Sequence, residues 1–561
     1  MNDMTGGPLV YVALGGAGEI GMNCYLYGHG QGAERRWIMV DLGIGFGDME
    51  TAPGVELIVP DLSFVFEERE RLDAIFLTHG HEDHIGAVPH LWDRLRAPIY
   101  ARPFTAALTR RKMQEAGLDP KPVREVRLGD RTKAGPFEVE FLNVTHSIPE
   151  ASMLAIRTAS GTLVHSGDFK MDAEPQIGQA FDIAPFEALG REGVQALACD
   201  STNVFMPGEA GSEAEVIDNV TRLIQSAPGA VAATTFASNV ARLKTLAEAA
   251  RDSGRAIVVA GRAMRRMIEV AVETGQIDDF PTVTPEDRAR DIPDENLFYL
   301  VTGSQGEGRA ALARIAAGTH PTVSLGEGDL VLFSSKTIPG NEAGIYRLYN
   351  RLSENGVRVI DGDMERIHVS GHARRDDLRR LYEALRPKVA VPLHGEHRHL
   401  VEHAKSAIEW GAGDAIVAPN GAVVRLDGNR PEQVDEIESG RVYLDGSIEV
   451  GAMDGVVRQR LKMARVGLVV VSVVLDGEGE LIADSEVVVQ GMPLENADWP
   501  TALDEAIAEA VDDAMDVAPS KQRRVDGGVE EICGRAVRRV ANKLIGKKPV
   551  VSVIIHRLED D

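Results

Sequence analysis

The heptapeptide Thr78-His79-Gly80-His81-Glu82-Asp83-His84 follows directly on the apolar run Ala74-Ile75-Phe76-Leu77 and is the strongest indication of function in this sequence. It holds three imidazoles and two carboxylates within six residues. A strand that ends in a tight turn fans alternate side chains around one point, and imidazole with carboxylate suits zinc or a similar divalent cation. A solvated polar loop would explain one histidine, but not this density. The heptapeptide therefore predicts a metal site at the end of a buried strand.

Four further positions repeat the pattern of an apolar run that ends in a candidate ligand. They are Asp41 in IMVDLG, His146 in NVTHSIPE, Asp168 in VHSGDF and His394 in VAVPLHGE. Each position alone is weak evidence, because a strand-end aspartate is more often a turn former and a lone histidine more often a surface residue. Together with the histidine cluster, they supply enough ligands for two ions.

Length and composition indicate a folded protein of several domains. A chain of 561 residues is too long for one core, so about two to four domains are expected. The longest apolar stretch, Val466 to Leu475, is too short to cross a bilayer, and the N-terminal MNDMTGGPLV lacks the features of a secretory leader. Only Cys24, Cys199 and Cys533 are present, which fits a reducing compartment. We therefore expect a cytoplasmic protein with no membrane association, whose metal is held by histidine and carboxylate.

The net charge of −26, from 60 basic and 86 acidic residues, counts against a nucleic-acid partner. Basic residues nevertheless cluster along the chain, and a groove can be locally positive on an acidic protein, particularly beside divalent cations. The clusters are Arg110 to Lys112, Arg262 to Arg266, Arg374 to Arg380 and Arg535 to Lys548.

The chain is expected to be α/β throughout. Short apolar runs up to about residue 200 predict buried strands, and strand-like runs alternate with helical patterns between about 210 and 350, which indicates a parallel sheet. In that part, Ser212 and Glu215 form a capping-box pattern before a helix. After residue 350 the runs VRVID and VAVPLHGE, on either side of a helix, indicate a return to the first domain. An acidic, glycine-rich linker and a strand-helix-helix-strand module then complete the chain.

The ligand motifs, in order, resemble the metallo-β-lactamase superfamily. The resemblance implies an αββα sandwich in which His79, His81 and His146 hold one metal, Asp83, His84 and His394 hold the other, and Asp168 bridges the two. It also implies that Asp41 orients an imidazole without coordinating. The cofactors expected are two zinc ions per subunit, with manganese or magnesium as alternatives.

Motifs further along the chain narrow the resemblance to the β-CASP group, which works on nucleic acid. They are Asp200-Ser201-Thr202, Phe236-Ala237-Ser238-Asn239, His368-Val369-Ser370-Gly371-His372 and Leu393-His394-Gly395-Glu396. Within that group, GGAGEIGMN near the start, TGSQGE at 302–307, KTIPGNE at 336–342 and the final VVSVIIHR are together similar to the bacterial ribonuclease J family. This similarity covers nearly the whole chain, with a minor departure at Cys199, where a hydroxyl residue is expected.

The resemblance implies a domain order. The lactamase domain occupies residues 1–208 and returns at 351–432, an inserted β-CASP domain occupies 209–350, and a linker at 433–458 precedes a small α/β domain at 459–561. The last domain carries no metal-ligand pattern, which favours a purely structural role. The resemblance implies that it forms a homodimer or homotetramer, and its basic helix could instead touch RNA.

The family also implies a reaction and its residues. Two divalent ions would activate a water for attack on phosphorus, with Asp83 in the catalytic set. His372 is expected to donate a proton to the leaving oxygen or to hydrogen-bond with it, and Asp200 to position a neighbouring imidazole. His372 could instead be a helix cap. The expected binding residues for an RNA phosphate are Ser238, Asn239, His368, Ser370, Gly371 and His372. The expected activity is 5′-to-3′ exonucleolytic digestion of single-stranded RNA, favouring 5′-monophosphate ends, with endonucleolytic cutting, in messenger decay and ribosomal RNA maturation.

Three other functions compete with this interpretation. A small-molecule metallohydrolase of the glyoxalase or lactonase kind would share the histidine cluster but has no use for the middle domain. A β-CASP nuclease that acts on DNA, or only endonucleolytically, is compatible with the β-CASP motifs, but TGSQGE and VIIHR favour ribonuclease J. A scaffold or RNA-binding protein that has lost catalysis is disfavoured because every ligand position is intact.

Overall fold

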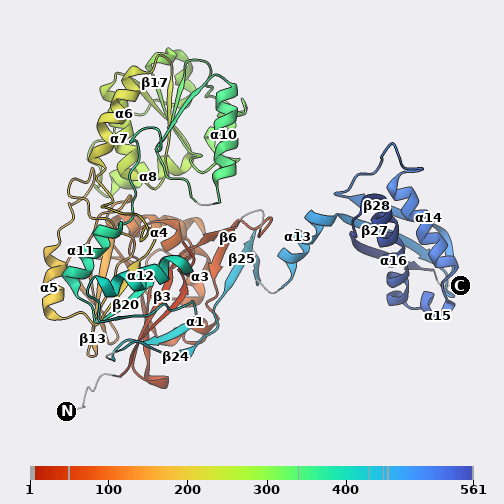
Figure 1. Cartoon of the computed structure of the whole chain (residues 1–561), viewed down its shortest axis with the longest axis horizontal. Helices are drawn as coiled ribbons and strands as arrows, with labels where there is room; N and C mark the ends of the chain where they lie inside the picture. Colours follow the sequence, from red (N-terminus) through yellow and green to blue (C-terminus); the bar gives the residue numbers. More distant parts are fainter. Residues whose placement is uncertain are drawn as a thin grey trace. The chain divides into compact units, whose positions relative to one another are not determined.

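The computed structural model describes residues 7–47, 51–338, 340–428, 430–446, 448–451 and 454–558 (Figure 1). The chain forms two compact units, one made of residues up to 45 with 59–441, the other of 46–58 with those from 442 onward. Residues 1–6, which belong to the stretch that was searched for a leader, lie outside the described residues, as do positions 447, 452 and 453 of the expected linker. Among the described residues, no helix is both long enough and apolar enough to cross a membrane.

The first unit contains a sandwich of an eight-stranded and a seven-stranded sheet. In order across the first sheet the strands are β24 (Glu432–Glu436), β23 (Ala422–Arg425), β1 (Leu9–Gly15), β3 (Cys24–His29), β4 (Arg36–Val40), β7 (Leu72–Phe76), β8 (Ile99–Ala101) and β9 (Val123–Glu125). In order across the second they are β10 (Arg131–Ala134), β11 (Phe137–Asn143), β12 (Ser152–Thr158), β13 (Gly161–His165), β14 (Ala196–Asp200), β20 (Val389–Leu393) and β22 (Asp414–Ala415). Alternate side chains of both sheets, such as Tyr11 and Phe141, are buried in one core between them.

Helices cover the outer faces of this sandwich. On the first sheet they are α1 (Ser63–Glu67), α2 (Glu82–Ile85), α3 (Val88–Leu95) and α4 (Pro103–Glu115), and on the second α5 (Ala184–Glu192), α11 (Arg375–Leu385) and α12 (His397–Glu409). The apolar stripe of α11, Leu378, Leu381, Tyr382 and Leu385, is fully buried in the core of the second layer. A two-residue strand β2 (Ala17–Gly18) pairs with β21 (Gly395–Glu396). The expected αββα sandwich is confirmed.

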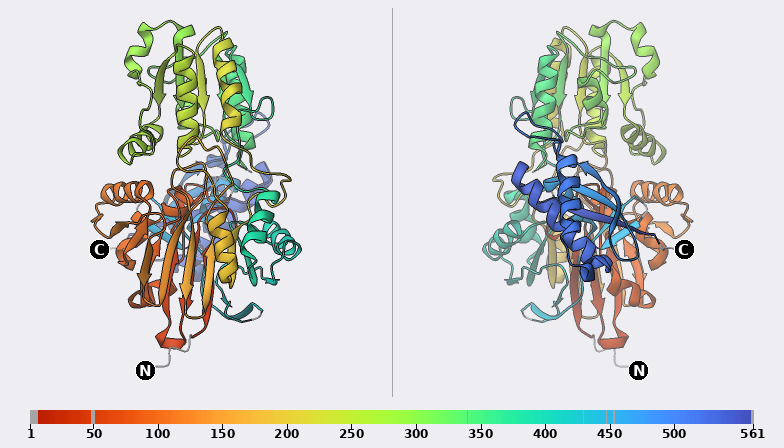
Figure 2. Two further views of the ribbon diagram at one scale, coloured as in Figure 1. Left: turned by 90° about the vertical axis from the view of Figure 1, so that its left-hand side faces the viewer. Right: turned by 90° about the vertical axis from the view of Figure 1, so that its right-hand side faces the viewer.

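The inserted α/β part has a five-stranded, wholly parallel sheet in the order β16-β17-β15-β18-β19 (Figures 1 and 2). Its strands are β15 (Val231–Thr234), β16 (Ala256–Ala260), β17 (Leu297–Val301), β18 (Leu330–Phe333) and β19 (Arg358–Asp361). One face packs on α6 (Ala214–Ser226), α7 (Val240–Asp252) and α8 (Arg262–Glu273), the other on α9 (Ala311–Ala316) and α10 (Glu342–Glu354). The parallel sheet expected here is confirmed.

Two local expectations for this part need correction. The run VRVID does not begin the return to the sandwich, because β19 is the edge strand of the five-stranded sheet and pairs with β18. The capping box is present only in part: Glu215 accepts the N–H of Ser212, but α6 begins at Ala214, whose N–H is accepted by the Ser212 hydroxyl.

The second unit carries the C-terminal module, a three-stranded sheet in the order β28-β27-β29 covered by helices. Its elements are α13 (Val456–Val466), β27 (Leu468–Leu475), β28 (Leu481–Gln490), α14 (Leu503–Asp516), α15 (Ser520–Arg523), α16 (Asp526–Ile545) and β29 (Val550–Arg557). Strand β28 was not expected. The remaining short strands are β5 (Gly45–Phe46), β6 (Leu57–Pro60), β25 (Arg441–Asp445) and β26 (Ile448–Gly451), so much of the expected linker is extended strand.

Candidate metal centre

The candidate ligands gather at one edge of the sandwich because they follow the carboxyl ends of parallel strands. Strands β4 and β7 are parallel, and so are β13, β14 and β20. Parallel strands end at the same edge, which is where ligand sites form in open α/β sheets. Strand β3 runs antiparallel to β4, so Asn23, directly before β3, lies at the same edge and contacts His394, 371 positions away in the sequence.

The first set of donors comprises His79, His81, His146 and Asp168, whose ligand atoms all lie within 4.8 Å of one another. Asp168 Oδ2 lies 3.6 Å from His79 Nε2 and 3.8 Å from His146 Nε2. Burial lowers the pKa of His79 and of His146 well below the usual value, and lowers that of His81 to about 4. These three rings are therefore neutral and keep a lone pair for a cation.

The second set comprises Asp83, His84, Asp168 and His394, again within 4.8 Å. His84 Nε2 lies 3.2 Å from Asp168 Oδ2, and His394 Nε2 lies 3.6 Å from Asp168 Oδ1. A tetrahedral cation with bonds of about 2.0–2.1 Å to nitrogen needs donors about 3.3 Å apart. The distances from Asp168 to His79, His84, His146 and His394, 3.2–3.8 Å, are close to this requirement.

Asp168 belongs to both sets and gives the clearest indication that a cation belongs here. It is 2% exposed, and its Oδ1 has no hydrogen-bond partner. A buried carboxylate oxygen without a donor is costly, and a cation removes that cost. The donor set and this unsatisfied oxygen fit divalent metal.

Hydrogen bonds hold the remote nitrogen of several ligand rings. His84 Nδ1 is 2.7 Å from Asp41 Oδ2, and His146 Nδ1 donates to the carbonyl of Gly371 at 2.6 Å. Asp41 also accepts the N–H and hydroxyl of Thr78, each at 2.8 Å. These contacts fix the tautomer in which the other ring nitrogen faces the metal position. Asp41 lies behind His84 and is absent from the two donor sets.

Asn23 performs the same task for His394 and was not identified from the sequence. Its Oδ1 is 2.8 Å from His394 Nδ1, and its amide Nδ2 donates to Asp83 Oδ2 at 3.3 Å. The Tyr25 hydroxyl donates to the same Oδ1 at 2.6 Å. Asn23 is the last residue of GGAGEIGMN, so the motif contained the position but gave no chemical reason for it.

Asp200 and His372 form a pair beside Asp168. His372 Nδ1 lies 2.9 Å from Asp200 Oδ2, while Asp200 Oδ1 accepts the N–H and hydroxyl of Thr202. Burial acts to lower the pKa of His372, but the carboxylates of Asp200 and Asp168 outweigh it and raise the value to about 9. The ring is therefore protonated near neutral pH and can donate a proton.

The five-residue segment His368–His372 approaches the donors from the side of the inserted domain. The Gly371 carbonyl accepts from His146, and the Ser370 hydroxyl accepts from Asn203 Nδ2 at 2.9 Å and from the His372 N–H at 3.2 Å. Asn203 therefore holds this segment, and it too was missed in the sequence.

Ser238 and Asn239 lie at the start of α7. The side-chain oxygen of Asn239 accepts the N–H of Arg242 at 2.9 Å, so it caps this helix. Ser238 is half-buried beside it. Neither residue belongs to the donor sets at the metal position.

The basic clusters near the site are largely paired within the protein. On α4, Arg110 pairs with Glu125, Arg111 with Glu273 at 2.6 Å and Lys112 with Glu82 at 2.5 Å. Arg266 of α8 pairs in turn with Glu115 of α4. The positive charge of these clusters is therefore neutralised locally.

Four models of known protein families match most of this chain. Residues 17–261 match the metallo-β-lactamase superfamily, residues 228–352 the ribonuclease J β-CASP domain, residues 356–419 a Zn-dependent metallo-hydrolase RNA specificity domain, and residues 455–558 the ribonuclease J C-terminal domain.

Two curated relatives match this chain over most of its length. Ribonuclease J of Sinorhizobium meliloti is 42% identical over 551 residues, which cover 98% of this chain and 97% of that protein. Ribonuclease J of Thermus thermophilus is 36% identical over 499 residues, 87% of this chain and 86% of that protein. A crystal structure of an Enterococcus faecalis protein of unknown function, at 17% identity, superposes with a TM-score of 0.51 over 75% of this chain and 100% of that chain, which is a likeness of fold alone.

Proposed function

This chain belongs to the ribonuclease J family of metal-dependent ribonucleases, and from that membership we propose that it cuts single-stranded RNA by a two-metal mechanism. The proposed activity is 5′-to-3′ exonucleolytic, with a preference for 5′-monophosphate ends, accompanied by endonucleolytic cutting. We place this activity in cytoplasmic messenger decay and ribosomal RNA maturation.

His79, His81 and His146 would hold one cation, Asp83, His84 and His394 would hold the second, and Asp168 would bridge them. When bound, two such ions acidify a water and neutralise charge on the phosphate. Zinc is the proposed metal, with manganese or magnesium as alternatives, because imidazole and carboxylate donors suit several of these ions. Asp83, whose side chain is 28% exposed, is the one partly exposed residue of the second set of donors, so its carboxylate is suited to take the proton of the attacking water.

His372 would act on the side of the scissile phosphate that carries the leaving oxygen, opposite the attacking water. Its Nδ1 is held by Asp200, which leaves Nε2 to give a proton to the leaving oxygen. The raised pKa of His372 keeps that proton available at neutral pH. Asp200 thus positions and charges the ring.

A terminal phosphate pocket would account for the preference for 5′-monophosphate ends. We assign it to His368, Ser370 and Gly371 with Ser238 and Asn239 at the start of α7, where N–H groups and the helix dipole favour an anion. The single observation that carries the proposed function is the contact of Gly371 with the ligand His146 at 2.6 Å. It joins the segment assigned to RNA directly to the residues assigned to metal.

The test is digestion of one single-stranded RNA that carries either a 5′-monophosphate or a 5′-triphosphate, with zinc or manganese present. Mononucleotides are expected from the monophosphate RNA, and their release should be lost in His81→Ala. A DNA of the same sequence serves as the control. Inert RNA together with hydrolysis of a lactone or thioester would contradict the proposal.

We also propose that the chain is a homodimer or homotetramer assembled through its C-terminal module. Sedimentation of the full chain beside a chain that ends before residue 459 tests this. A full chain that sediments as a monomer would contradict it.

A further inference from the structure

Four charged side chains lie buried in a row between the sandwich and the inserted domain. They are Asp172, Lys170, Glu213 and Arg242, each at most 2% exposed. Lys170 Nζ lies 2.9 Å from Asp172 Oδ2 and 3.8 Å from Glu213 Oε1, while Arg242 binds Glu213 Oε2 through Nε at 3.0 Å and Nη2 at 2.7 Å. The row is electrically neutral as a whole.

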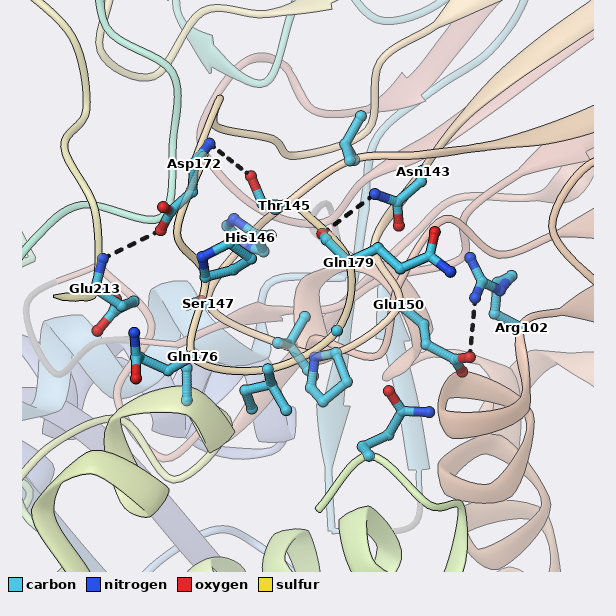
Figure 3. Close-up of a pocket in the computed structure, with 18 residues that line it drawn as sticks. Arg102, Asn143, Thr145, His146, Ser147, Glu150, Asp172, Gln176, Gln179 and Glu213 are labelled. Carbon is cyan, nitrogen blue, oxygen red and sulfur yellow. Dashed lines mark hydrogen bonds and ion pairs between the residues drawn. The ribbon is translucent and has the colours of Figure 1, made fainter. Parts of the chain in front are cut away.

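One end of the row is tied to the metal ligands. Lys170 is two residues beyond Asp168, the carboxylate common to both donor sets, and its N–H donates to the carbonyl of Thr145, the residue before His146. The Thr145 hydroxyl accepts the N–H of Asp172 at 3.0 Å, and the Glu213 N–H donates to Asp172 Oδ2 at 3.1 Å. Figure 3 shows Asp172 between Thr145 and Glu213, with His146 beside it, on the wall of a cavity of about 220 Å³.

The other end of the row is tied to the segment assigned to RNA. Nη1 of Arg242 donates to the carbonyl of Ile367 at 2.8 Å and to the Ser334 hydroxyl at 2.6 Å, and lies 3.4 Å from His368 Nδ1. The Ser334 hydroxyl donates to the same Ile367 carbonyl at 2.6 Å. Arg242 therefore fixes the residue at which the His368–His372 segment begins.

The free-energy cost of burying these four charges indicates that they are not present for stability alone. Burying four charges carries a desolvation cost that their attraction repays only in part, and apolar side chains of similar size are often no less stable. Even here one acceptor, Glu213 Oε1, is left without a hydrogen bond. Apolar packing cannot replace the directional hydrogen bonds that one guanidinium donates to a carboxylate and to a carbonyl at the same time.

We propose that the Asp172–Lys170–Glu213–Arg242 row sets the position of the His368–His372 segment relative to the metal ligands, with Arg242 as the positioning residue. This inference rests on the proposed function, because the segment is the one assigned to the RNA phosphate and the leaving oxygen. Arg242 touches neither substrate nor metal in this scheme and acts through Ile367 and His368.

The experiment compares Arg242→Leu, Glu213→Leu and the double variant with wild type. Each single variant leaves a buried charge unpaired and is expected to lower the melting temperature, whereas the double variant removes one positive and one negative charge and should regain stability. Its kcat/KM on 5′-monophosphate RNA should nevertheless stay about 100-fold below wild type, because a displacement of the order of 1 Å suffices for such a loss. Bound metal per chain should remain that of wild type.

Two further variants separate positioning from folding. Arg242→Lys keeps the charge but loses the planar fork, and is expected to lose activity and the preference for 5′-monophosphate over 5′-hydroxyl RNA with little change in melting temperature. Arg255→Leu is the matched control, since Arg255 is a buried arginine of the same domain that binds the carbonyls of Gly229 and Leu297, at the amino ends of strands β15 and β17. It should lower stability and leave the preference intact.

The outcomes distinguish this inference from the proposed function. If the wild-type protein does not cut RNA, the proposed function itself is wrong. Active wild type with a double variant that regains both stability and kcat/KM overturns only the positioning role, and so does Arg242→Lys with full activity.

Discussion

Gly371 lies directly against the ring of the candidate ligand His146. A Cβ at this position would lie 2.8 Å from Cε1 and 2.9 Å from Nδ1 of His146, closer than real Cβ contacts. The carbonyl of Gly371 also accepts from that ring. Any side chain here must therefore push a candidate ligand out of place.

We predict that Gly371→Ala lowers metal affinity and ribonuclease activity by about 10- to 100-fold, the usual cost of disturbing the support of a ligand. Metal per chain, measured by atomic emission after dialysis, and the rate on 5′-monophosphate RNA check this. Gly362→Ala is the control, because its nearest neighbour, His368 Cβ, is 3.6 Å away. Full metal content and full rate in Gly371→Ala would refute the prediction.

At this scale the sequence predicted which candidate donors lie together, but it did not predict the residues that support them. The metal-ligand candidates were found because histidines and carboxylates gather at strand ends, as in the segment from His79 to His84. Asn23, Asn203 and Arg242 were missed. An amide or an arginine has no such local pattern, and the partners that give these three residues their roles lie between 29 and 371 positions away in the sequence.

Helix α12 contains His403, which the fold keeps as a buried neutral base. The ring is 0% exposed, and its Nδ1 lies 2.8 Å from the Ser201 hydroxyl, next to Asp200. Burial lowers the pKa of His403 from 6.5 to about 4. Since the unfolded chain takes up this proton first, the contribution to stability is full above about pH 6.5 and is lost as the pH falls towards 4.

We predict that the free energy of unfolding of wild type falls by about 2 kcal/mol more than that of His403→Gln between pH 7 and pH 5, from 1.36 kcal/mol per pKa unit. Denaturant unfolding at the two pH values measures the difference, with metal removed from both proteins. The exposed His397 on the same helix, replaced by Gln, should leave the pH dependence unchanged. Equal slopes for wild type and His403→Gln would show that the buried ring does not resist protonation.

Helix α4 carries the basic cluster Arg110 to Lys112, but its arginines face acidic partners. Arg111 lies 3.5 Å from Glu269 and 2.6 Å from Glu273, both on α8. A guanidinium already held by two carboxylates has little to offer a phosphate. Such partly exposed pairs also add little stability, about 1 kcal/mol or less.

We predict that Arg111→Gln leaves both the RNA affinity and its salt dependence unchanged, measured by fluorescence anisotropy in the inactive His81→Ala background. Loss of a phosphate contact on a single strand would lower the slope of log affinity against log salt by about 0.7. A change of that size would show that Arg111 releases its glutamates and binds RNA.

The elements that the sequence failed to predict share a physical cause. Strand β28 carries Asp484 and Glu486 among its apolar residues, because one edge and one face of it are exposed. Strand β19 was recognised as a strand but placed in the wrong sheet. The hydrophobic pattern of a segment indicates how its residues are buried. It does not indicate with which strand the segment pairs, because that depends on contacts between segments such as β18 and β19.

At the scale of the whole molecule, the order of domains followed from the sequence because each motif is confined to a few residues. The division into two units did not follow from the sequence in this way, because each unit combines stretches that are far apart along the chain. The C-terminal module has a core of its own, which includes Val471, Ile507 and Val537, while all metal-ligand candidates belong to the other unit. Metal should therefore stabilise one unit and leave the other unaffected.

We predict two transitions in calorimetry, only one of which responds to metal. A cation present at about 1,000 times its dissociation constant stabilises the unit that binds it by about 4 kcal/mol, so a chelator should lower the melting temperature of the first unit alone. Asp168→Asn removes the carboxylate charge common to both donor sets and should make the first transition insensitive to the chelator, while the second stays as in wild type. If the chelator shifted both transitions together, the two units would unfold as one, and the cores would not be independent. If it shifted neither, the donors gathered around Asp168 would not be binding metal in the folded protein.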